Sequence, residues 1–245
     1  TTALEMLQDA PDIDTLVVPV GGGGLISGCA VAARGLKPDI RVIGVEAAGY
    51  AAMRQLLAGE QVTVGGDTIA EGIAVRDIGR LPLAIARALL DRVLAVDEVT
   101  IERAIALLLE IEKTVAEGAG AAPLAALLQY RSLFTGRRCA LVLAGGNIDM
   151  RVLSSVIMRG LVRAGRLARL RIEITDLPGS LSRVTAIVGD CGGNIVDVVH
   201  QRLFTELSVK SAVLELAVET RDREHTEAIV AALVMAGYHV TGGPE

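Results

Sequence analysis

The feature that most limits what this chain can fold into is the segment VVPVGGGGLISG, residues 17–28, where an apolar run ends at four consecutive glycines. The apolar run is typical of a buried strand, and the residues after the glycines have helical spacing. A sharp turn needs only one or two glycines. Uncovered backbone amides at the start of a helix favour an anion such as phosphate. We therefore expect a phosphate site at Gly21, Gly22, Gly23 and Gly24.

Short β-branched runs alternate with longer helical segments from the start of the chain to about Gly165. This alternation predicts an α/β fold, a mostly parallel sheet with helices on both faces. We expect strands at residues 15–20, 41–46, 92–96 and 138–143. We expect helices near residues 25–36, 50–57, 81–90, 98–113, 119–130 and 149–164, and an ordered loop at 61–79.

The pattern changes after the basic segment RAGRLAR, residues 163–169. Alternating runs at residues 170–175, 194–202, 210–219 and 238–241 are interleaved with helical runs at 181–190 and 223–236. This βαββαβ order predicts an antiparallel sheet with two helices on one face. We place one domain at residues 1–165 and a second at 168–245, joined by a short linker.

Composition excludes several classes of function. The net charge is −5, from 24 basic and 29 acidic residues, without a basic stripe interleaved with aromatic residues, so we expect no nucleic acid partner. No apolar run reaches the roughly 18 to 20 residues of a membrane span. Cys29, Cys139 and Cys191 are odd in number and widely spaced, which argues against a disulfide framework and fits a reducing cytoplasm.

Two further motifs have the chemistry of a site. The segment ALVLAGGNID repeats the strand, glycine turn and helix pattern at Ala144, Gly145, Gly146 and Asn147. Loops at the carboxyl ends of parallel strands line one crevice, so we expect both glycine loops to face one site. In VAEGAGAAP, Glu117 stands among small residues at a helix start. It either favours the helix dipole or faces the site, and both interpretations stay open.

The glycine loop has other interpretations. A P-loop would need a Gly-Lys-Ser/Thr sequence, and no lysine is present in the loop. Gly22 and Gly24, with Glu46 about 20 residues on, match part of a dinucleotide fingerprint. The third glycine of that fingerprint is one residue late. A nicotinamide-dependent dehydrogenase is therefore an alternative.

The motifs VVPVGGGGLISG, TIAEGIAV, VAEGAGAA and LAGGNID, in that order, resemble the threonine dehydratase (threonine ammonia-lyase) branch of the fold-type II pyridoxal-phosphate enzymes. The resemblance implies that residues 21–24 and Leu25 hold the phosphate of pyridoxal 5'-phosphate. It also implies that Ala144, Gly145 and Asn147 lie by the pyridine ring and that Glu117 lines the substrate pocket. The implied reaction is β-elimination from L-threonine or L-serine, which converts threonine to 2-oxobutanoate and ammonia.

The family's Schiff-base lysine, and its Ser/Gly/Asn loop for the substrate carboxylate, belong to an amino-terminal segment that does not occur here. Lys37, Lys113 and Lys210 do not match that position, Lys113 being placed in the helix at 98–113. We therefore expect no catalytic residue in this chain. It should correspond to the carboxyl-terminal portion of the enzyme and be inactive by itself.

Two positions depart from the family pattern. Ala144 stands where relatives usually carry Ser or Cys beside the pyridine nitrogen, and alanine offers no donor there. Serine racemase relatives bind a metal through a residue that matches Glu46, but the later acidic position is Ala52. We expect no metal site.

The segments RLRIEITDLPGSLSRVTAIV and GGNI resemble an ACT domain, a regulatory βαββαβ module. The resemblance implies an amino-acid effector site across a homo-oligomer interface, with candidate residues Asp176, Gly179, Ser180, Leu181 and Asn194. A plain turn and helix start is the alternative. The missing lysine and Ala144 also favour a second hypothesis, an amino-acid-sensing regulatory protein without catalysis. The histidines His200, His225 and His239 are expected to be surface or packing residues.

Overall fold

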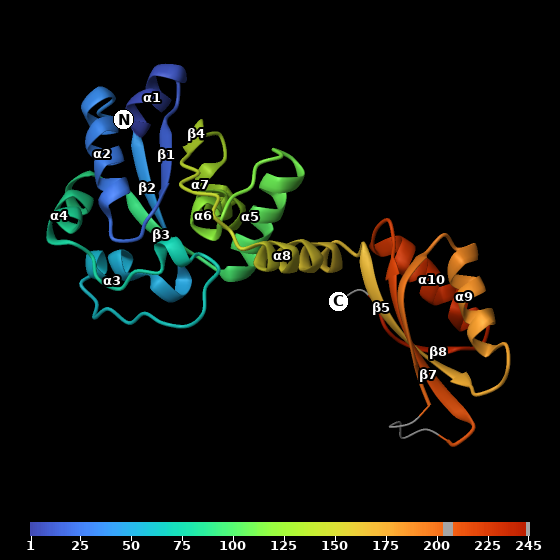
Figure 1. The fold of residues 1–245 in the computed structure, drawn as a ribbon. Helices are drawn as coiled ribbons and strands as arrows, with labels where there is room; N and C mark the ends of the chain where they lie inside the picture. Colours follow the sequence, from blue (N-terminus) through green and yellow to red (C-terminus); the bar gives the residue numbers. More distant parts are fainter. Residues whose placement is uncertain (203–207, 244–245) are drawn as a thin grey trace. The chain divides into compact units, whose positions relative to one another are not determined.

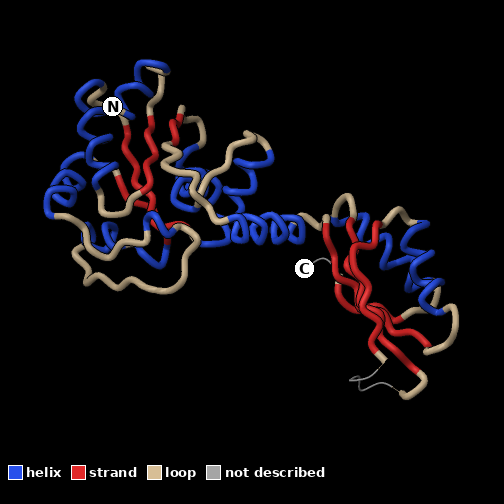
Figure 2. Tube along the Cα trace, in the orientation of Figure 1, coloured by secondary structure: helices blue, strands red, loops and turns tan. Residues whose placement is uncertain are grey.

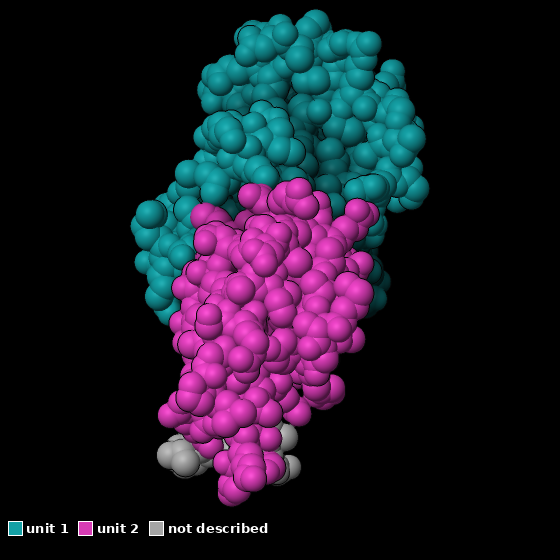
Figure 3. Space-filling view, turned by 90° about the vertical axis from the view of Figure 1, so that its right-hand side faces the viewer, with its two compact units in different colours: residues 1–156 teal, residues 157–245 magenta. Residues whose placement is uncertain are grey.

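The computed structural model describes residues 1–202 and 208–243. The chain forms two compact units, Thr1–Val156 and Ile157–Glu245 (Figure 3). Helix α8 (Met150–Arg163) begins in the first unit and ends in the second. The predicted division at residues 165–168 lies after this helix, and assignment of that boundary to two functional domains stays a prediction.

Unit 1 is built on a parallel sheet with strand order β3-β2-β1-β4. Its strands are β1 (Thr15–Pro19), β2 (Arg41–Ala47), β3 (Arg92–Val96) and β4 (Cys139–Leu141). Each neighbouring pair is parallel, which confirms the predicted arrangement. The fourth strand is shorter than predicted, although Val142 N–H still donates to Val17 O at 3.0 Å.

Helices cover both faces of this sheet (Figure 1). They are α1 (Thr2–Asp9), α2 (Gly24–Leu36), α3 (Ala52–Ala58), α4 (Arg80–Leu89), α5 (Glu98–Glu110), α6 (Gly118–Gln129) and α7 (Arg131–Phe134), with 3-10 turns at Ala48–Tyr50 (η1) and Glu71–Ile73 (η2). In β1, Val17 packs into the core shared with α5 and α6, whereas Leu16 and Val18 pack into the core shared with α1 and α2. Successive side chains of a strand point to opposite faces, so the two cores lie on the two sides of the sheet.

Two expectations for unit 1 need correction. Helix α1 was not expected, because its eight residues are too few for a clear period and no side chain caps its start. Helix α5 ends at Glu110, so Lys113 lies in the following loop rather than in the helix. The φ of Lys113 is +55°, which is incompatible with a continuing right-handed helix.

Unit 2 has the predicted βαββαβ order. Its elements are β5 (Leu167–Thr175), α9 (Ser180–Asp190), β6 (Asn194–Gln201), β7 (Ser211–Glu219), α10 (Arg223–Met235) and β8 (His239–Gly242). The sheet is antiparallel with order β6-β7-β5-β8, and both helices lie on one face (Figure 2). Alternate residues of β5, including Leu170, Ile172 and Ile174, are buried in the core below the helices. None of the helices in the described part of the chain combines the length and apolar character needed to cross a bilayer.

Candidate functional site

The glycine loop joins β1 to α2 at the carboxyl edge of the parallel sheet. Gly23 has a φ of +90°, and a Cβ there would lie 2.7 Å from both Met53 Cε and Pro82 Cβ. The fold itself therefore requires glycine at this position. Gly21 also approaches a neighbouring segment, because a Cβ there would lie 3.3 Å from Gly72 O.

Gly22 and Gly24 differ from these two glycines. Neither has a positive φ, both are exposed, and a Cβ at either would meet no atom of the chain within 4 Å. Within the described residues, the N–H groups of Gly22, Gly23 and Gly24 donate no hydrogen bond. The first amides of this 13-residue helix are thus unpaired, and a side chain at position 22 or 24 would fill open space beside them. This arrangement fits a phosphate, and Leu25, 41% exposed, borders it.

Ser27 fixes the loop from the first turn of α2. Its hydroxyl donates to Gly23 O at 2.6 Å, and its N–H donates to the same oxygen at 3.1 Å. The side chain is only 7% exposed, so water does not compete with this bond. Ser27 stands where the dinucleotide fingerprint would have its third glycine. The four-residue spacing from Gly23 was the available signal for its role.

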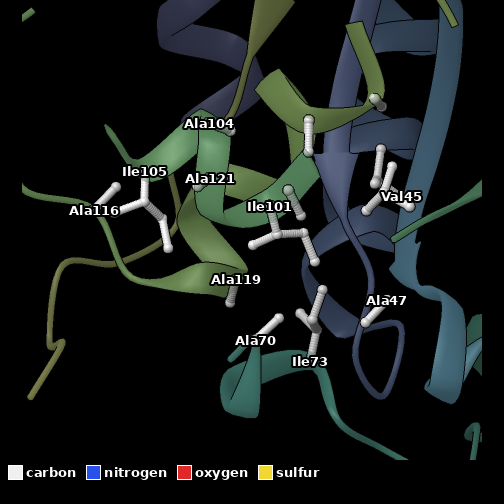
Figure 4. Packing of buried hydrophobic residues seen from close by; sticks show 14 of the residues in the cluster. Val45, Ala47, Ala70, Ile73, Ile101, Ala104, Ile105, Ala116, Ala119 and Ala121 are labelled. Atoms are coloured by element: carbon white, nitrogen blue, oxygen red, sulfur yellow. The ribbon is translucent and has the colours of Figure 1, made fainter. Parts of the chain in front are cut away.

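The four sequence motifs come together at this edge. The η2 segment lies against Gly21, and a Cβ at Gly72 would lie 3.6 Å from Glu117 Oε1. Ala70 and Ile73 anchor η2 in the core beside Ala119 of α6 (Figure 4). The two glycine loops are therefore linked by close contacts at one edge of unit 1, and their use as a single site stays a prediction.

Glu117 occupies the position before α6, but its side chain makes no capping hydrogen bond. Its N–H donates to Gly145 O at 3.1 Å. Its carboxylate lies so close to Gly145 that a Cβ at that glycine would overlap Oε1. Glu117 is thus held at the second glycine turn instead of closing the helix end. Its role in a substrate pocket stays a prediction.

The loop after β4 brings Ala144 and Asn147 to the surface beside that turn. The contact with Glu117 is enough to explain why residue 145 is a glycine. Asp149 Oδ1 accepts the N–H groups of Arg151 and Val152 at 2.9 and 3.2 Å, which caps α8. Placement of this loop beside a pyridine ring stays a prediction.

Glu98 is a residue that the sequence analysis missed. Its Oε2 accepts the N–H of Ile69 at 2.9 Å and so ties the loop at residues 61–79 to the start of α5. Thr68 Oγ1 accepts the N–H of Ala70 at 3.1 Å in the same segment. The expected ordered loop is therefore held by specific bonds. No local pattern links positions 69 and 98.

Glu46, at the end of β2, is 1% exposed. Its two carboxylate oxygens accept the N–H groups of Met53 at 2.8 Å and Arg54 at 3.0 Å. Burial raises the pKa of this carboxyl from 4.5 to about 7. Both oxygens are enclosed and already bonded, so Glu46 is not available to a ribose. The dehydrogenase interpretation is wrong on this point.

The described residues contain no group of three or more acidic, histidine or cysteine side chains arranged to hold a metal. Two of the lysines donate to backbone carbonyls within unit 1. Lys37 Nζ donates to Pro11 O and Ile13 O, before the start of β1, and Lys113 Nζ donates to Glu110 O at 2.6 Å. Lys210 belongs to unit 2.

The predicted effector loop lies between β5 and α9. Gly179 has a φ of +82° and precedes α9, and the buried Ser180 hydroxyl accepts from Arg183 Nη2 at 3.1 Å. Asp176 Oδ1 pairs with Arg202 Nε at 3.1 Å. Leu181 is 37% exposed. The plain interpretation as a turn and helix start accounts for the backbone, and the effector role stays a prediction.

Asn194 lies at the other end of the same sheet. Its Nδ2 donates to Glu219 Oε2 at 2.8 Å, and it pairs with Glu219 at the end of β7. The loop that begins at Asp176 follows Thr175, which pairs with Ser211 at the start of β7. One chain therefore does not bring Asn194 to this loop, so a shared site would need residues from two copies.

The histidines occupy the expected surface and packing positions. His225 is 6% exposed, its Nδ1 accepts the N–H of Arg221 at 3.1 Å, and its Nε2 lies 2.9 Å from Cys191 O. His239 Nδ1 lies 3.2 Å from Glu173 Oε1 and His200 is exposed. All three belong to unit 2, away from the glycine loop in sequence.

The chain is similar to several known proteins. L-threonine ammonia-lyase of Thermotoga maritima is 40% identical over 242 residues, which cover 98% of this chain and 60% of the relative. The processed form of threonine deaminase isoform 2 from Solanum lycopersicum matches with a TM-score of 0.59 and 30% identity, over 64% of this chain and 47% of that one. Maize serine racemase matches with a TM-score of 0.57 and 36% identity, over 65% of this chain and 50% of that one.

This chain thus spans about 60% of the length of the Thermotoga maritima relative. A family profile described as "Pyridoxal-phosphate dependent enzyme" matches residues 1–145, more than half of the chain. The matched residues include Gly22 and Gly24, whose amides are unpaired, and Glu117 with its neighbours at the carboxyl edge of the sheet. The chain belongs to the pyridoxal-phosphate dependent enzyme family.

Proposed function

We propose that this chain is the carboxyl-terminal part of a pyridoxal 5'-phosphate-dependent L-threonine ammonia-lyase. The observation that carries the proposal is the pair of glycines, Gly22 and Gly24, whose unpaired amides lie at the start of α2 beside space that a side chain would fill. Their motif and three others meet at one sheet edge. The 40% identity to a protein named L-threonine ammonia-lyase supports the choice of reaction.

In this proposal, residues 21–24 and Leu25 bind the cofactor phosphate through backbone amides and the helix dipole. Ala144, Gly145 and Asn147 lie beside its ring, and Glu117 forms part of the substrate pocket. The bound cofactor supplies an electron sink for the electrons left when Cα loses its proton. Loss of the β-hydroxyl as water gives an enamine, which tautomerises to an imine that water hydrolyses to 2-oxobutanoate and ammonia.

The proton at Cα must be taken by a group outside this chain, because Lys37 and Lys113 are bonded to carbonyls away from the loop. We assign that task to a lysine in the part of the relatives' length that the chain does not span. The chain alone is then inactive. L-serine is the alternative substrate, since a serine racemase shares the fold. The free state of Cys29, Cys139 and Cys191 supports a cytoplasmic location.

For unit 2 we propose an ACT-like regulatory domain that binds a free amino acid between two copies of the chain. Asp176, Gly179, Ser180 and Leu181 would come from one copy and Asn194 from the other, because they lie at opposite ends of β7. Calorimetry on the intact oligomer tests this with isoleucine, valine, threonine and serine. Heat with one of them is expected, and no heat with any of the four contradicts the effector site.

Gly24→Asp in the complete gene product tests the lyase proposal. A carboxylate at the open position would repel the phosphate, and loss of charge-assisted bonds predicts at least about 100-fold weaker cofactor binding. Formation of 2-oxobutanoate from L-threonine should fall with it. Gly35→Asp is the matched control, because position 35 is also exposed with open space and lies at the other end of α2.

The control should change cofactor affinity less than about threefold. Wild-type affinity in Gly24→Asp would refute the assignment of the loop. Gly23→Asp should also abolish cofactor retention, but its φ of +90° adds backbone strain to the repulsion. Gly24→Asp therefore isolates the electrostatic effect.

A non-catalytic amino-acid sensor is the second candidate, favoured by the positions of Lys37 and Lys113. The two candidates differ in the complete gene product. A sensor would bind an amino acid without retaining the cofactor or forming 2-oxobutanoate. A lyase would retain the cofactor and form 2-oxobutanoate.

A further inference from the structure

A pocket lies in unit 1, near the first residues of β3. Its volume is about 370 Å³, and it is bordered by the ends of α3 and α4 and the first residues of β3. The glycine loop instead follows the carboxyl end of β1. Helix α4 touches Gly23 with Pro82, in its first turn, whereas Arg87, in its last turn, borders the hollow. This pocket is therefore a separate place from the cofactor loop.

Three arginines, Arg54, Arg87 and Arg92, line this pocket from three different elements. All three are exposed, and among the described residues no carboxylate pairs with any of their guanidinium groups. Like charges gathered around one hollow repel each other. A bound anion would remove that repulsion.

Asp91 is the one acidic residue on the pocket wall, and its carboxylate is already bonded. Its Oδ2 accepts from Arg34 Nη2 at 3.0 Å and from Val42 N–H at 2.7 Å. Arg34 therefore balances the charge of Asp91. Arg54 also attracts the buried carboxyl of Glu46. The positive charge of Arg87 and Arg92, and the remainder of that of Arg54, is left for a ligand.

The rest of the wall is apolar. Ala86 and Val93 are buried, and Leu57 and Leu90 are partly buried. A volume of about 370 Å³ lies within the range of small-molecule sites, roughly 300 to 1,000 Å³. The pocket thus offers a cationic rim and an apolar wall to the same ligand.

We propose that this pocket binds a small organic phosphate monoester, with the phosphate among Arg54, Arg87 and Arg92 and the organic part against Leu57 and Leu90. A phosphate monoester carries about −1.5 to −2 charge at pH 7, against −1 for a single carboxylate. Its oxygens accept the paired N–H groups of the arginine fork. No residue of the glycine loop takes part.

The test uses glycerol 3-phosphate and inorganic phosphate as probes, with calorimetry on the chain carrying Gly24→Asp, so that the glycine loop no longer binds phosphate. Saturable binding with one site per chain is expected, tighter for glycerol 3-phosphate than for inorganic phosphate. Arg87→Gln and Arg92→Gln should each weaken it about tenfold, a charge-assisted bond's typical contribution. Raising the salt concentration should also weaken it.

Arg103→Gln is the matched control, because Arg103 is an exposed arginine of α5 that does not line the pocket. It should leave the affinity unchanged. Equal affinity in the Arg87→Gln, Arg92→Gln and Arg103→Gln variants would overturn the proposal. So would citrate binding as tightly as glycerol 3-phosphate, because the pocket would then not select phosphate. These outcomes do not depend on whether the glycine loop holds a cofactor.

Discussion

The two sheets of this chain gather their loops in different ways. In the parallel sheet of unit 1, the loops after β1 and β4 leave at the same edge, where Gly21, Gly72, Glu117 and Gly145 follow one another in close approach. In the antiparallel sheet of unit 2, successive loops leave at opposite ends, so Asp176 and Asn194 are separated by the length of β7. Parallel strands bring several loops of one chain to the same edge, whereas in this antiparallel sheet the two candidate loops lie at opposite ends.

The largest expected effect is that of Gly118→Ala, which tests the close packing of the loops in unit 1. A Cβ at Gly118 would lie 2.5 Å from Ile69 O, because the start of α6 packs directly against the backbone at Ile69 and Ala70. We expect unit 1 to lose about 3 kcal/mol of unfolding free energy, the upper end for overpacking, measured by urea denaturation. Gly189→Ala in α9 is the control, because a Cβ there meets nothing within 4 Å. It should change stability by less than about 1 kcal/mol. Equal effects of both would contradict the close packing inferred for unit 1.

A second prediction tests the buried hydrogen bonds of unit 2. His225→Phe leaves Cys191 O and the N–H of Arg221 without their partner. The expected loss is about 2 kcal/mol, the cost of unsatisfied buried polar groups, measured as the urea midpoint of unit 2. Cofactor affinity of the glycine loop should not change. His239→Phe, at an exposed pair with Glu173, should cost less than about 0.5 kcal/mol. A His225→Phe variant as stable as His239→Phe would show that the buried bonds contribute little.

The smallest predicted effect concerns pH and Glu46. Burial holds its folded pKa at about 7, above the ordinary 4.5, so the folded state binds more protons than the unfolded state between these values. The stability from this group is fully present below about pH 4.5 and is lost as the pH rises through about 7. Between pH 6 and 8 the loss is about 1 kcal/mol.

Glu46→Gln removes this titration, so its unfolding free energy should change less over that pH interval than that of the unmodified chain. Urea denaturation at a series of pH values measures the difference. Equal slopes in the two proteins would mean that the carboxyl does not titrate near neutral pH. Glu227→Gln, at an exposed residue of α10 in unit 2, is the control and should leave the slope as it is.

Local patterns were sufficient for both sheets. Alternation and helical period come from side chains a few residues apart, so they predicted the four parallel strands and the βαββαβ order of unit 2. The glycine loop was also visible, because its chemistry is contiguous. The site around it was visible as motifs, but their contacts with one another were not.

What the sequence did not reveal depends on residues far apart in it. Glu98 holds Ile69 across 29 positions, and the pocket around Arg54, Arg87 and Arg92 exists only because α3, α4 and β3 fold together. The enclosure of Glu46 likewise depends on where α3 begins. Helix α1 was missed for another reason, since eight residues without a side-chain cap give a weak local signal.

Each compact unit is one uninterrupted stretch of sequence, and the polypeptide passes from the first to the second only once, within α8. A single junction in a gene is therefore enough to attach the second unit to another protein or to remove it. Recombination can then exchange the second unit without interrupting the coding sequence of the parallel sheet.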